Sequence, residues 1–132
     1  MDKENFALIV ADNNCIAVLG KYVKNMGYKV LNENTGENAL ESLRKNGELV
    51  KTVIIDNNIP DMDFSDFYMK LKKIRPKICC IFAGDDFVAE DQENLFGNGN
   101  IAFLKKPFTF RNLNASLITV YTKELASYGV TI

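Results

Sequence analysis

The chain of 132 residues contains no histidine. This absence excludes Ser-His and Cys-His nucleophile pairs, histidine-bound zinc and any role as a histidine phosphodonor. Any chemistry at this protein must therefore use carboxylate, lysine, amide or hydroxyl groups, together with a hard cation.

Long apolar runs and a strong charge bias are also missing. No stretch approaches the roughly 20 apolar residues that a membrane helix needs, and the segment Met1-Asp2-Lys3-Glu4-Asn5 does not resemble a signal peptide. The net charge of −1 gives no bulk attraction for nucleic acid or anionic lipid. We therefore expect a cytoplasmic protein with no membrane partner and no direct nucleic-acid partner.

Cysteine is sparse and its count is odd. The chain has three cysteines, and Cys79 and Cys80 are adjacent on a predicted strand, where they should point to opposite faces. We expect buried free thiols in a reducing cytoplasm, with a structural disulfide as the less favoured alternative.

Strand-like and helix-like segments alternate along the whole chain. The length fits one domain over residues 1–132, with a core over about 6–126 and a tail or junction over 127–132. Apolar residues at helical spacing follow every strand, which predicts five helices, including a short one over 87–96. This alternation predicts an α/β fold: a doubly wound five-stranded parallel sheet with helices on both faces. The predicted strands cover residues 6–11, 28–31, 50–55, 78–83 and 101–105.

Three of these strands end at a charged residue. Asp12 follows the first strand, Asp56 the third and Lys106 the fifth. In open parallel sheets, ligands bind in the crevice beyond the carboxyl ends of the strands. We expect the three side chains to meet there, although Asp12 could instead be an N-cap of the first helix and Lys106 a solvated lysine.

Five short motifs occur in an order and spacing that resemble the receiver domain of two-component response regulators, the CheY-like family. The resemblance covers essentially the whole chain and implies the strand order 2-1-3-4-5 of the flavodoxin-like fold. The motifs are Leu8-Ile9-Val10-Ala11-Asp12, Gly27-Tyr28-Lys29-Val30, Gly36-Glu37-Asn38-Ala39-Leu40, Val53-Ile54-Ile55-Asp56 with Ile59-Pro60-Asp61-Met62-Asp63, and Phe103-Leu104-Lys105-Lys106-Pro107-Phe108.

The resemblance implies a role for each site residue. Asp56 matches the phosphoacceptor, which receives a phosphoryl group from a histidine kinase or phosphotransfer protein. Asp12 and Asp56 would bind Mg²⁺ with the backbone carbonyl of Asn58, Lys106 would contact the phosphoryl oxygens, and Phe103 matches the switch aromatic. Such a domain is not an enzyme beyond its own phosphorylation and dephosphorylation, and its effector is unknown.

Three positions depart from the family pattern. Ala11 replaces an acidic residue that holds the metal largely through water, so we expect Mg²⁺ binding to weaken by about 10–100-fold rather than disappear. The family has Ser or Thr at the end of the fourth strand, a position that we assign to Phe82, whose ring cannot donate a hydrogen bond and fills the space that the switch aromatic would enter. Phe64 stands where glycine is common, so we expect a different loop path or an early helix start.

Several side chains near the predicted site have simpler interpretations. Phe64, Phe67 and Tyr68 favour core packing, with an exposed aromatic patch as the alternative. Asp61 and Asp63 are interpreted as loop charges without a role, and Asp85-Asp86 as a turn and helix start rather than a second metal site.

The leading hypothesis is therefore a phosphoacceptor receiver domain. The alternative is a pseudo-receiver, a phosphorylation-independent interaction module, which Ala11 and Phe82 favour. A carboxylate-nucleophile phosphatase would need a second acid at position 58, where the chain has Asn58. A flavin or nucleotide site would need a glycine-rich first turn, which is missing after the first strand.

Overall fold

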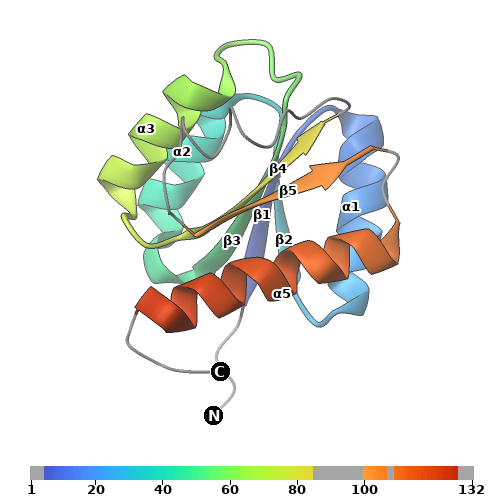
Figure 1. Ribbon diagram of the computed structural model, residues 1–132. Helices are drawn as coiled ribbons and strands as arrows, with labels where there is room; N and C mark the ends of the chain where they lie inside the picture. Colours follow the sequence, from blue (N-terminus) through green and yellow to red (C-terminus); the bar gives the residue numbers. More distant parts are fainter. Residues whose placement is uncertain (1–4, 85–99, 107–108, 128–132) are drawn as a thin grey trace.

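The structure is a computed structural model that describes residues 5–84, 100–106 and 109–127 (Figure 1). Five parallel strands form one sheet in the order β2-β1-β3-β4-β5. The predicted α/β class, the parallel sheet and the strand order are thereby confirmed. The strands are β1 (Phe6–Val10), β2 (Lys29–Glu33), β3 (Val50–Asp56), β4 (Cys79–Gly84) and β5 (Ile101–Lys105).

Helices cover both faces of this sheet. Figure 1 shows α2 and α3 on one side and α1 and α5 on the other, and a separate apolar cluster fills each interface. The central strand β3 is buried along nearly its whole length, as expected for a strand with helices on both faces. The helices are α1 (Asn13–Asn25), α2 (Gly36–Asn46), α3 (Phe64–Ile74) and α5 (Phe110–Ser127), with a short 3₁₀ turn η1 (Gly47–Leu49) after α2.

Side-chain caps fix where the helices begin. The carboxylate of Asp12 accepts a hydrogen bond from the amide of Cys15, and the Asp63 carboxylate does the same for Asp66. Thr35 caps α2 in the same way, by accepting a hydrogen bond from the amide of Asn38. Such caps satisfy amide groups that the first helical turn leaves unpaired. The Asp12 cap also fixes the position of this residue at the end of β1.

The boundaries differ from the prediction in a few places. The second strand was expected over 28–31 but runs over Lys29–Glu33, because it pairs with all of β1. The helix expected over 87–96 and the pair Asp85-Asp86 lie outside the described residues.

The expectation of an early third helix is confirmed, because α3 begins at Phe64. The alternative of an exposed aromatic patch is wrong: Phe67 is fully buried, Tyr68 is 7% exposed and Phe64 packs against the same core. These rings fill the space between α3 and the sheet.

All three cysteines are free thiols, as expected, but the expected burial holds only for Cys79 and Cys80; it is wrong for Cys15, which is partly exposed in the first turn of α1. Cys79 packs in the cluster on the α1 and α5 face, and Cys80 packs in the cluster on the α2 and α3 face. The two neighbouring thiols therefore point to opposite faces of β4.

Candidate functional site

The predicted charged residues meet at the carboxyl edge of the sheet. The ammonium of Lys106, just after β5, lies 2.8 Å from the Oδ1 atom of Asp56, the last residue of β3. The Asp12 carboxylate, after β1, contributes an oxygen within 4.8 Å of an Asp56 oxygen. Parallel strands in register end at one edge, so residues far apart in the sequence converge there.

Asp56 is the buried centre of this group. Its side chain is 1% exposed, whereas that of Lys106 is 19% exposed. The Oδ1 atom forms the ion pair with Lys106 but accepts no hydrogen bond of ordinary geometry from the residues that the structure describes. A buried carboxylate oxygen of this kind can bind a further cation, because burial removes the water that would otherwise solvate it.

The other Asp56 oxygen contacts a residue that the sequence did not single out. The thiol of Cys15, in the first turn of α1, donates to Asp56 Oδ2 over 3.6 Å. Burial, and then the negative charge of Asp56, raise the pKa of the Cys15 thiol to about 11. The thiol is therefore protonated at neutral pH.

Asp12 both caps α1 and faces the site. The hydrogen bond from the Cys15 amide is the main reason that the pKa of the Asp12 carboxyl lies below its usual value. The exposed carboxylate is thus ionised at neutral pH. N-capping uses Oδ1, and carboxylates have enough acceptor sites to bind a cation as well.

The oxygen donors at this edge fit Mg²⁺, which binds one or two carboxylates, carbonyls and waters. Two carboxylates lie close together, and one of them, Asp56, is buried. Its Oδ1 atom pairs with Lys106 and accepts no regular hydrogen bond within the described part of the chain. A cavity of about 370 Å³ adjoins Asp12. Its lining places Asp12 together with Asn58, the predicted carbonyl ligand; the lining residues are Asp12, Asn13, Asn34, Asn58 and Pro60.

Asn34 holds the wall of this cavity in place. Its side-chain amide donates to the carbonyl of Ala11 over 2.9 Å and to the Asn13 side chain over 3.0 Å. Ala11 itself is fully buried in the core. The position where the family usually carries a second carboxylate is therefore occupied by a packed methyl group and offers no donor of its own.

Asp61 has a structural role that the sequence interpretation missed. Its two carboxylate oxygens accept hydrogen bonds from the amides of Gly36, over 2.8 Å, and Glu37, over 3.0 Å. These amides are the first two of α2, so Asp61 ties the loop after β3 to the start of that helix. Asp63, also interpreted as a loop charge without a role, caps α3.

The sheet register differs from the assignment of Phe82 to the hydroxyl position. Asp56 pairs with Ala83 of β4, whereas Phe82 pairs with Ile55. Because side chains alternate between faces, Ala83 lies on the same face as Asp56 and Phe82 on the opposite one. The position at which the family has Ser or Thr therefore corresponds to Ala83. The methyl group of Ala83, like the ring of Phe82, cannot donate a hydrogen bond.

Phe82 instead forms the centre of an aromatic cluster beneath α3. Its ring lies 4.4 Å from the ring of Phe64 and stacks on Phe103 at 5.9 Å, with 24° between the ring planes. Phe103 is partly buried against the same core. The ring of Phe82 thus packs directly against the predicted switch aromatic, on the face of the sheet away from Asp56.

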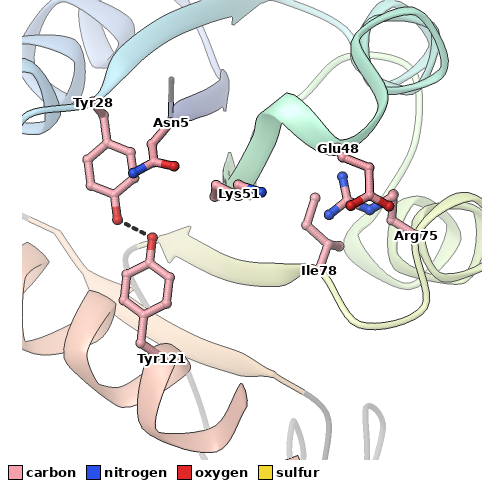
Figure 2. A pocket seen from close by; sticks show the side chains of 7 residues that line it. All are labelled: Asn5, Tyr28, Glu48, Lys51, Arg75, Ile78 and Tyr121. Carbon is pink, nitrogen blue, oxygen red and sulfur yellow. Dashed lines mark hydrogen bonds between the residues drawn. The ribbon is translucent and has the colours of Figure 1, made fainter. Parts of the chain in front are cut away.

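A second polar cavity, of about 380 Å³, lies at the amino edge of the sheet (Figure 2). In it the hydroxyls of Tyr28 and Tyr121 are hydrogen-bonded to each other, and Tyr121 is 2.8 Å from the Thr52 hydroxyl. Arg75 donates to the carbonyls of Gly47 and Val50. These polar groups connect α5, β2, β3 and the end of α3, which indicates a structural role.

Comparison with known proteins identifies one family. The family model of the response regulator receiver domain matches residues 7–118. The Sensor kinase CckA of Brucella abortus is 30% identical over 120 residues, which make up 89% of this chain and 12% of that kinase. The transcriptional regulatory protein ZraR of Escherichia coli strain K12 is 26% identical over 119 residues, 89% of this chain and 26% of that regulator. The chain thus spans only a small part of each relative.

Solved structures agree with this fold. A response regulator receiver domain protein from Clostridium thermocellum has a TM-score of 0.76 at 18% identity, over 97% of this chain and 99% of that one. A CheY-like receiver domain protein from Methanospirillum hungatei also has a TM-score of 0.76 at 18% identity, over 95% and 99%. Among the described residues, no helix is both long and apolar enough to cross a bilayer.

Proposed function

The chain belongs to the response regulator receiver domain family, and we propose that within it Asp56 is the phosphoacceptor and Mg²⁺ the cofactor. The observation that carries this proposal is the ion pair between the buried Asp56 and the partly exposed Lys106, with the Asp12 carboxylate alongside. A nucleophilic carboxylate, a mobile cation and a second acid are the groups that phosphoryl transfer to an aspartate needs.

Each side chain has a distinct part in the proposed reaction. An Asp56 oxygen attacks phosphorus, the bond from phosphorus to the donor's leaving group breaks, and an acyl phosphate forms. The ammonium of Lys106, 2.8 Å from Asp56 Oδ1 beforehand, is long and mobile enough to follow the incoming phosphoryl oxygens. Bound Mg²⁺, held by Asp12, Asp56 and the Asn58 carbonyl, would offset the repulsion between the carboxylates and the phosphoryl group.

Access to Asp56 requires two side chains to move. Lys106 and Cys15 both contact the carboxylate, which is 1% exposed. Both contacting side chains are partly exposed, so rotamer changes alone can open a path. We therefore infer that the donor reaches Asp56 from the cavity next to Asp12.

The partners follow from the proposed chemistry. These 132 residues contain no histidine, so we propose that the phosphoryl group comes from a histidine kinase or phosphotransfer protein, or from a small phosphodonor. We propose that the domain passes its state to an effector through the surface near β5. In this proposal the domain is a signalling module rather than an enzyme with an external substrate.

Two alanines make this site poorer than usual for the family. Ala11 provides no acidic donor for the metal, and Ala83 provides no hydroxyl for the phosphoryl group. A charge-assisted hydrogen bond is worth about 1.5–3 kcal/mol, so phosphorylation is expected to be slow. If phosphorylation of Asp56 were lost completely, the domain would be a phosphorylation-independent interaction module.

The experiment is the intact mass of the protein after incubation with Mg²⁺ and acetyl phosphate. We expect a gain of one phosphoryl group that Asp56→Asn abolishes and Asp12→Asn strongly reduces. Asp66→Asn, an exposed carboxylate on α3, is the matched control and should leave the gain unchanged. If no adduct forms at any Mg²⁺ concentration, the interaction module replaces the proposed function.

A further inference from the structure

Cys15 places a thiol between the two carboxylates of the acidic edge. Its sulfur, one carboxylate oxygen of Asp12 and one of Asp56 lie within 4.8 Å of one another. We propose that Asp12, Cys15 and Asp56 form a binding site for a thiophilic divalent cation, represented by Zn²⁺. One part of this inference rests on the proposed function: Zn²⁺ bound at this site displaces Mg²⁺ and blocks phosphorylation of Asp56.

The donor spacing suits a tetrahedral ion. Zn²⁺ binds thiolate sulfur at about 2.3 Å and carboxylate oxygen at about 2.0–2.2 Å, so tetrahedral angles place sulfur and oxygen about 3.6 Å apart. The observed distance from Cys15 Sγ to Asp56 Oδ2 is 3.6 Å. The exposed Asp12 side chain can supply the remaining adjustment by rotation about its χ angles.

The buried carboxylate points independently to a cation. Asp56 is 1% exposed, and no described residue donates a hydrogen bond of ordinary geometry to its Oδ1 atom. Within residues 5–84, 100–106 and 109–127, the cation that pairs with it is the ammonium of Lys106, which is itself partly exposed. A bound divalent cation would neutralise this carboxylate directly, and Lys106 could then turn towards solvent.

Ligand chemistry determines which cation is favoured. Mg²⁺ takes oxygen donors and gains nothing from sulfur, whereas a thiolate strengthens the binding of Zn²⁺. The alanine at position 11 removes an oxygen donor that would favour Mg²⁺. When Zn²⁺ binds, the Cys15 thiol gives its proton to solvent and a zinc–sulfur bond forms, without any change in oxidation state.

The surroundings leave room for an ion with three protein ligands. The cavity of about 370 Å³ that adjoins Asp12 can supply water as the fourth ligand and gives a route of entry. The other two thiols do not compete, because Cys79 and Cys80 are buried within the apolar clusters. Both are therefore suitable as control positions.

The test is direct metal binding by the chelator-treated, reduced chain, with ZnCl₂ competed against a chromophoric chelator. We expect one ion per chain, and Cys15→Ser should weaken binding by at least about tenfold, since losing even an outer-shell partner costs about 10–100-fold. Cys79→Ala should bind like the parent. With CdCl₂, a ligand-to-metal sulfur band in the ultraviolet should appear in the parent and disappear in Cys15→Ser.

The outcomes separate this inference from the proposed function. Equal zinc affinity in the parent and Cys15→Ser, or no cadmium–sulfur band, overturns the site whether or not Asp56 is phosphorylated. If the site binds Zn²⁺, micromolar ZnCl₂ should inhibit phosphorylation by acetyl phosphate in the parent and at least tenfold less in Cys15→Ser. Equal inhibition of both proteins overturns the regulatory part of the inference.

Discussion

Ala83 lies directly beside Asp56 in the sheet. The two residues are register partners on β4 and β3, and the amide of Asn57, after Asp56, donates to the carbonyl of Ala83 over 2.9 Å. Their side chains therefore project on the same face, at the edge where Lys106 also lies. A residue at position 83 can influence the chemistry of Asp56 without intervening groups.

Adding a hydroxyl at this position should speed phosphorylation. Ala83→Thr would place a donor next to the incoming phosphoryl oxygens, and a charge-assisted hydrogen bond of about 1.5 kcal/mol corresponds to roughly tenfold in rate. Ala83→Val has nearly the same shape but no hydroxyl, so it controls for the crowding of a fully buried site. Rates of adduct formation with acetyl phosphate should be about tenfold higher for Thr than for Val. Equal rates would show that this position does not reach the phosphoryl group.

Phe82 should matter for stability and not for the chemistry of Asp56. Phe82→Leu removes ring contacts with Phe64 and Phe103 and should lower the free energy of unfolding by about 1 kcal/mol in a urea titration. The phosphorylation rate should stay within twofold of the parent, because the ring lies on the other face of the sheet. A large rate change would restore the earlier assignment of Phe82 to the phosphoryl site.

Asp61 should stabilise the start of α2. Asp61→Ala leaves the amides of Gly36 and Glu37 without their acceptors and should cost about 1–2 kcal/mol of unfolding free energy. Asp61→Asn, which keeps one good acceptor oxygen, should cost about half as much. Hydrogen exchange would locate the effect: the two amides should lose protection, while those of α3 keep theirs. Uniform loss of protection would instead indicate a global effect.

The hydrogen bonds that join Tyr28, Tyr121 and Thr52 at the amino edge of the sheet should contribute to stability in a coupled way. Tyr121→Phe removes the hydroxyl that joins Tyr28 to the fully buried Thr52. An unsatisfied buried hydroxyl costs about 1–3 kcal/mol, so the melting temperature should fall. Thr52→Val in the Tyr121→Phe background should recover part of the loss, and additive effects in this double-mutant cycle would refute the coupling.

Much of the fold could be predicted from sequence, because the alternation of apolar segments and the caps are local signals. Thr35 and Gly27 mark helix ends through chemistry that a single residue carries. The proximity of Asp56 and Lys106 could also be predicted from the sequence, since the carboxyl ends of parallel strands lie at one edge of the sheet.

The remaining features depend on register and on long-range contacts. Whether Phe82 or Ala83 faces Asp56 is decided by the pairing of β3 with β4, and a shift of one residue exchanges the two faces. The partnership of Asp61 with Gly36 joins residues 25 apart and leaves no periodic signal. The proximity of Cys15 to Asp56 depends on how α1 packs on the sheet.

The most direct test of the central claim is the location of the modified side chain. After treatment with acetyl phosphate and Mg²⁺, borohydride reduction would convert an aspartyl phosphate to homoserine, which peptide mass spectrometry can place. The account predicts homoserine at position 56 and at no other aspartate, and none without Mg²⁺. Homoserine at Asp12 or at any other aspartate, with position 56 unchanged, would contradict it.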